Sequence, residues 1–251
     1  MKKFLSLTGI TLGAILVGNT VSASDTYFHY EHSYATENRY HGDEFGIFHQ
    51  TDIGAWVGVA IRLYNQESDA VLEDVVSNSY SLKTGYDYAL SPELTLTPNL
   101  ETRFYSGGST DQRFGEDPGD SQKAGARYTP GLKLSWQAAE PLNLYTQYRF
   151  DYRKVTRSIA DEGEQNHRRH RIEVGADYAV LDNLTLSYTA YYYDGNYWLA
   201  DSKEHDYRQD FDIALDVTPQ WQLNLGAEDV ARSAIESGRE ARIKAGFTYL
   251  F

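Results

Sequence analysis

Apolar and polar residues alternate along most of this chain with a period of two. From residue 241 to residue 251, the odd positions carry Ala, Ile, Phe and Tyr, and the even positions carry mostly Arg, Lys, Gly and Thr. The same alternation recurs over 142–152, 184–192 and 211–217. A period of two places successive side chains on opposite faces of a β-strand, so the pattern predicts an all-β protein.

The connections between these segments alternate between two lengths. Short connections rich in Gly, Pro, Asp or Asn, which favour turns, lie at 51–54, 90–93, 138–141, 181–183 and 218–220. Longer polar connections lie at 65–77, 107–123, 156–167, 195–205 and 232–238. This alternation is typical of transmembrane barrels, which have short periplasmic turns and long external loops.

These patterns predict a transmembrane antiparallel β-barrel of about twelve strands. The expected strands are 25–36, 42–50, 55–64, 78–89, 94–106, 124–137, 142–155, 168–180, 184–194, 206–217, 221–231 and 239–251. The second strand is the least defined, because its two faces are hard to assign. Closure of the sheet removes strand edges whose polar groups lipid does not satisfy. Pro98 and Pro130 fall inside strands, where we expect local bulges.

The amino-terminal region predicts export from the cytoplasm. Lys2 and Lys3 precede an apolar stretch over 4–17, and Val21-Ser22-Ala23 follows as a small-residue cleavage pattern. The apolar stretch is shorter than the roughly 20 residues of a membrane-spanning helix, which favours a signal peptide over an anchor. We therefore expect a signal peptide at 1–23 and a barrel at 24–251, in the outer membrane of a Gram-negative bacterium.

Composition excludes several function classes. The chain has no Cys, which rules out cysteine catalysis and thiolate metal sites. Its formal net charge of −13 makes it a poor candidate for binding nucleic acid. Its seven His residues belong to no compact Ser/His/acid motif of the kind that a hydrolase needs. We expect no enzymatic activity, no metal site and no cofactor.

If the apolar face lies in lipid, the other face lines the lumen and carries many basic residues. The candidate substrate-binding residues are Arg62, Lys83, Arg103, Arg127, Lys133, Arg149, Arg153, Arg169, Arg171, Arg208, Arg242 and Lys244. Those from 103 to 171 form a first group on four consecutive strands. The others, apart from the intermediate Arg208, form a second group nearly across the barrel. Guanidinium groups match carboxylates bidentately, and rows of weak sites allow release, so the sequence predicts a channel for anionic, carboxylated solutes.

An alternative role for these cations is structural pairing with acids of the lumen. The candidate partners are Glu101, Asp151, Glu173, Asp177, Asp210, Asp212, Asp216 and Glu228. These acids are densest on the strands at 206–217 and 221–231, away from the first basic group. The segregation predicts a field across the lumen and favours the channel.

The chain resembles the oligogalacturonate-specific porins, a family of outer-membrane channels for acidic sugars. The resemblance rests on its size, about twelve strands, the terminal Phe251, the Gly54-Ala55-Trp56 turn and inward arginines on facing walls. It implies a narrow monomeric barrel with two basic tracks, which correspond here to the first and second groups. The acids at 210, 212 and 216 depart from the family pattern.

The resemblance also implies partners and a function. The expected function is diffusion of acidic oligosaccharides, such as oligogalacturonate or related uronic and sialic acid sugars. The expected partners are those solutes, outer-membrane lipid, lipopolysaccharide and the barrel assembly machinery. A structural or adhesive barrel that acts through its acidic loops is the alternative, and a barrel hydrolase is a weaker one.

Overall fold

The computed structural model describes residues 25–66, 76–105, 125–155, 166–234 and 237–251. Its strands are β1 (Asp25–Ala35), β2 (Tyr40–Gln50), β3 (Ala55–Gln66), β4 (Val76–Tyr86), β5 (Tyr88–Ala89), β6 (Leu94–Tyr105), β7 (Gly125–Ala139), β8 (Leu142–Val155), β9 (His167–Leu181), β10 (Leu184–Gly195), β11 (His205–Asp216), β12 (Trp221–Ala231) and β13 (Arg239–Leu250). Within these ranges, no helix is long and apolar enough to cross a membrane. The predicted signal peptide lies outside the described residues.

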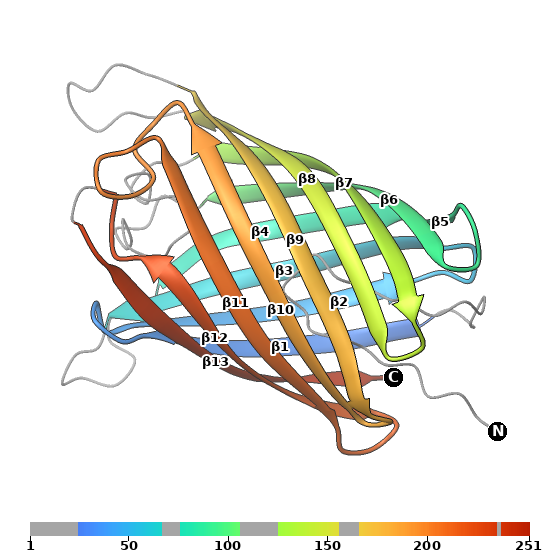
Figure 1. The fold of residues 1–251 in the computed structure, drawn as a ribbon. Helices are drawn as coiled ribbons and strands as arrows, with labels where there is room; N and C mark the ends of the chain where they lie inside the picture. Colours follow the sequence, from blue (N-terminus) through green and yellow to red (C-terminus); the bar gives the residue numbers. More distant parts are fainter. Residues whose placement is uncertain (1–24, 67–75, 106–124, 156–165, 235–236) are drawn as a thin grey trace.

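The strands form one antiparallel sheet that closes into a barrel. β1 pairs with β2 on one side and with β13 on the other, and β4 pairs with β6. The carboxyl terminus lies at the end of the barrel that carries the short turns (Figure 1). The prediction of an antiparallel barrel is confirmed, and the predicted strand limits differ from the observed ones by a few residues.

Thirteen labelled segments make twelve barrel strands, because β5 continues β4 past Asp87. Both segments pair with β6 in one register, from Gly85 opposite Asn99 to Tyr88 opposite Leu96. This register places the interruption beside Pro98, whose nitrogen carries no hydrogen to donate to a neighbouring strand. The proline therefore interrupts one ladder without ending the strand.

The prediction of bulges at Pro98 and Pro130 is wrong. The pairing of β6 with β7 runs through both residues without a shift, with Pro98 opposite Leu132 and Pro130 opposite Leu100. The register between β7 and β8 is also the same on either side of Pro130. Each proline costs a ladder hydrogen bond on one side, which the sheet absorbs without an extra residue.

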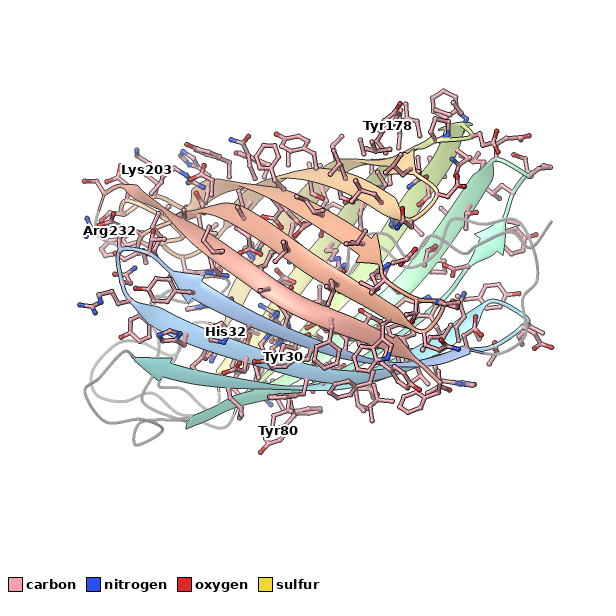
Figure 2. The ribbon with its side chains drawn as sticks, turned by 90° about the horizontal axis from the view of Figure 1, so that it is seen from below. Tyr30, His32, Tyr80, Tyr178, Lys203 and Arg232 are labelled. Atoms are coloured by element: carbon pink, nitrogen blue, oxygen red, sulfur yellow. The ribbon has the colours of Figure 1, made fainter. Side chains whose placement is uncertain are left out.

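The two faces of the sheet have opposite chemistry. Side chains on the outer face are exposed and apolar, such as Val174, Phe211 and Leu225. Figure 2 shows Tyr80 and Tyr178 projecting away from the barrel. The inner face instead buries charged and hydroxyl side chains, many of them less than a tenth exposed. The molecule is therefore apolar outside and polar inside, which suits a barrel in lipid around a polar lumen.

Candidate transport lumen

All twelve predicted basic residues lie on the inward face of the barrel. Eleven are 2 to 8 % exposed, and the side chain of Arg62 is 21 % exposed. Their neighbours along each strand point outward, because strand side chains alternate between faces. The placement of these side chains follows the sequence prediction, whereas their contact with a solute stays a proposal.

The strands β6 to β9 form the wall that carries the first basic group. Arginines stand directly opposite one another across this wall: Arg103 beside Arg127, Arg127 beside Arg153, and Arg149 beside Arg171. Like charges at opposed positions destabilise a sheet. The wall therefore holds a repulsive arrangement that a barrel built only for stability would avoid.

Three carboxylates on the same wall hold these arginines in place. Glu101 lies 2.7 Å from Arg103, 3.8 Å from Arg127 and 3.7 Å from Arg149. Because one carboxylate serves three guanidinium groups, it compensates only part of their charge. The same strands also carry Asp177, so seven basic residues share this wall with four acids.

The other two carboxylates of this wall are also tightly held. Asp151 lies 2.6 Å from Arg169 and accepts a hydrogen bond of 2.7 Å from the Thr129 hydroxyl. Glu173 lies 2.9 Å from Arg171 and 3.2 Å from Arg149. These acids thus lie between the arginines of the first basic group. The sequence had predicted that most acids of the lumen lie on other strands than that group.

The second basic group is largely neutralised. Glu44 pairs with both Arg62 and Lys83. Glu228 lies 3.1 Å from both Arg242 and Lys244.

Two aspartates of β11 extend this neutralisation. Lys244 also lies 2.8 Å from Asp212, and Arg208 lies 2.6 Å from Asp210. Asp216 instead accepts a hydrogen bond of 2.8 Å from Gln222. On these strands carboxylates match the basic groups, so the positive surplus lies on the wall of β6 to β9. The charges are therefore unevenly distributed around the lumen, as the predicted field requires, but the second group does not form a bare basic track.

Aromatic rings also line the lumen, and sequence reasoning did not assign them a role. Arg208 lies over the ring of Tyr191 at 4.3 Å, Arg169 over Tyr193 at 4.9 Å and Lys133 over Tyr145 at 4.2 Å. The sequence signal was available, because these tyrosines occupy the polar-face positions of their strands. The cations and rings together form an amphipathic lining.

Comparison with known proteins places this geometry in a family. Residues 19–251 match the model of the oligogalacturonate-specific porin protein family, KdgM. The N-acetylneuraminic acid outer membrane channel protein NanC of Escherichia coli K12 is 22 % identical over 189 residues, which cover 74 % of this chain and 72 % of that protein.

Solved structures show the same fold. The NanC porin superposes with a TM-score of 0.68 at 16 % identity, covering 88 % of this chain and 98 % of its own. The KdgM porin in complex with disordered oligogalacturonate has a TM-score of 0.64 at 16 % identity and covers 90 % of this chain and 99 % of its own. These relatives are channels rather than enzymes. The chain therefore belongs to the oligogalacturonate-specific porin family and is an outer-membrane porin of a Gram-negative bacterium.

Proposed function

We propose that this porin lets acidic oligosaccharides diffuse through its lumen and that the wall of β6 to β9 is their path. The observation that carries the proposal is the set of directly opposed arginines, Arg103 with Arg127, Arg127 with Arg153 and Arg149 with Arg171. Such a row costs stability. It concentrates anions, which gives a reason for its presence in a channel.

Passage requires attraction without trapping. Solute carboxylates pass from one guanidinium fork to the next, and Glu101, Asp151 and Glu173 keep each fork partly neutralised. Several weak sites in series allow a solute to leave as readily as it enters. All twelve lumen cations named above contribute to the field, and the first group makes the contacts. We infer no chemical step, so the protein acts as a channel and not as an enzyme.

The proposal extends to the state of the protein in the membrane. We infer a monomer, because one closed sheet encloses the whole lumen. The apolar outer face contacts lipid and, at its external end, lipopolysaccharide. β13 engages the barrel assembly machinery, and residues 1–23 are removed on export.

The test removes two charges from the wall and measures ion preference. In Arg127→Gln/Arg149→Gln, we expect the reversal potential in a potassium chloride gradient to move toward cation preference, while conductance changes less. The matched control is Lys154→Gln/Arg168→Gln, which removes two charges from exposed positions on the outer face of β8 and β9. An unchanged reversal potential in the first variant, or cation preference in the unmodified pore, would make these arginines structural partners of the acids. The structural or adhesive barrel would then be the better reading.

A further inference from the structure

The connection between β10 and β11, residues 196–204, is a folded loop at the end of the barrel opposite the carboxyl terminus (Figure 1). The Leu199 backbone N–H donates to the Lys203 carbonyl at 2.7 Å, and the Lys203 N–H donates to the Ala200 carbonyl at 2.8 Å. Asp201 and Ser202 have φ angles of 49° and 56°. Positive φ at both central residues defines a type I′ turn. The β10–β11 loop therefore has a defined backbone.

This loop folds into the mouth of the barrel. Leu199 is only 3 % exposed and packs against Tyr191 and Tyr193. Both tyrosines are buried on the inward face of β10, whereas Tyr192 between them is half exposed on the outer face. A leucine that packs on inward rings lies inside the mouth. The side chain thus occupies space at the external end of the lumen.

One flank of the loop is fixed to β9. The ring of Tyr197 stacks on His167, with centroids 4.0 Å apart. The Arg168 backbone N–H donates to the Asn196 side-chain oxygen at 2.7 Å, and the Asn196 N–H donates to the Arg168 carbonyl at 3.1 Å. These contacts hold the start of the loop against the wall of β6 to β9.

The tip of the loop is fixed to the connection that follows β12. The Ser202 backbone N–H donates to the Ala234 carbonyl at 2.7 Å. That connection is held in turn, because the Asn38 amide donates to the Arg232 carbonyl at 3.0 Å. Figure 2 shows Lys203 and Arg232 at the same end of the barrel. The loop therefore spans part of the mouth, from β9 to the residues after β12.

We propose that the β10–β11 loop is a constriction of the external mouth and that Leu199 holds it in place. The burial of this apolar side chain between inward rings stabilises the docked loop. Solutes pass beside the loop, so it limits the width of the sugar chain that enters. The inference deepens the proposed function and rests on it only for the identity of the solute.

The first test measures docking in Leu199→Ser with trypsin, on the folded protein in lipid vesicles. Truncating a buried leucine should shift the docking equilibrium about thirtyfold or more toward the open loop. Cleavage after Lys203 should accelerate by the same factor, because its rate follows the population of the open form. The matched control is Leu181→Ser, which makes the same change at a position that is 59 % exposed. Its cleavage rate should equal that of the unmodified protein, and an equal rate in Leu199→Ser would overturn the role of Leu199.

The second test measures the width of the mouth in the same variants. In Leu199→Ser, single-channel conductance should increase, and larger neutral polyethylene glycols should enter the pore. The reversal potential in potassium chloride should not change, because no charge is altered. Faster cleavage with unchanged conductance and an unchanged polymer limit would show that the loop does not constrict the pore.

A shortened loop provides an independent variant. Asp194 pairs with His205, so Asn-Gly in place of residues 195–204 closes the β10–β11 hairpin with a two-residue turn. This variant should admit polymers at least as large as Leu199→Ser does, and the polymer limit of the unmodified pore would contradict the constriction. Because the polymers are neutral, failure here leaves the proposed passage of acidic sugars standing. That function fails instead if a galacturonate trimer neither blocks nor crosses the unmodified pore.

Discussion

Replacing Glu101 by Gln tests how the basic wall is balanced. The Glu101 carboxylate lies within 4 Å of Arg103, Arg127 and Arg149, and it is buried in the lumen. Glutamine has nearly the same shape but carries no charge. The substitution therefore removes one negative charge from a wall on which cations already outnumber acids.

The expected change in selectivity follows from Coulomb's law. Two unit charges about 8 Å apart interact by about 0.5 kcal/mol in bulk water and by about 2 kcal/mol at an effective dielectric constant of about 20. A passing anion that no longer meets this repulsion gains between those energies. The chloride permeability should then rise by at least about twofold and by at most about thirtyfold, and the potassium permeability should fall because potassium loses the same attraction, so the chloride-to-potassium ratio should rise by more than the chloride permeability alone.

The same substitution should weaken the folded state. Removing one partner of a buried ion pair costs about 3–5 kcal/mol, because the other partner stays buried without its counter-charge. Here the three arginines would repel one another more strongly. The urea concentration at the midpoint of barrel unfolding in lipid vesicles should therefore fall, while the anion preference increases.

Planar-bilayer recording of reversal potentials measures the first effect, and urea titration of the folded band on unheated gels measures the second. Glu140→Gln is the matched control, because it makes the same change at an exposed turn. It should alter neither quantity. A permeability ratio in Glu101→Gln that stays at the unmodified value, or decreases, would refute the idea that the wall charges set the potential in the lumen.

Three further predictions concern export, assembly and the lumen. Amino-terminal sequencing of outer-membrane protein should begin at or near Ser24, and an intact Met1 there would contradict the signal peptide. Deleting Phe251 should reduce the heat-modifiable folded form, because its backbone N–H donates to the Thr26 carbonyl at 3.0 Å where the barrel closes; unchanged assembly would argue against this role. Gly58→Ala should lower single-channel conductance, because its Cβ forces the Phe48 ring into the lumen, and an equal conductance would show that the ring moves elsewhere.

Much of the fold could be predicted because a barrel strand has two chemically distinct faces. On β13 the alternation of apolar residues with Arg242 and Lys244 fixes both the strand and the direction of its cations. β2 was harder because polar side chains occupy both of its faces. Glu44 points into the lumen there, whereas its neighbour Asp43 points outward to His32.

The contacts between charges could not be predicted in the same way. That Glu101 reaches Arg149, two strands away, depends on strand stagger and barrel diameter rather than on local sequence. The interruption between β4 and β5 at Asp87 depends on Pro98, which lies on the neighbouring strand β6. The sequence around Asp87 does not show which residue of β6 lies opposite it. The aromatic lining was missed because Tyr, Trp and Phe occur on both faces of the sheet, so residue type alone does not show whether a ring faces the lumen. The position of each ring in the alternation of its strand does show this.

The seam between β1 and β13 joins the two ends of the chain, with Tyr27 opposite Leu250 and Ala35 opposite Arg242. Every other ladder forms between segments that are neighbours in the sequence. The seam is therefore the contact of highest sequence separation, and its formation carries the largest loop-closure entropy cost of any ladder in the barrel. A chain interrupted before β13 would leave β1 and β12 as open edges in an environment without water to satisfy them. The barrel therefore closes only when β13 is present to pair with β1, so a chain that lacks β13 cannot complete the fold.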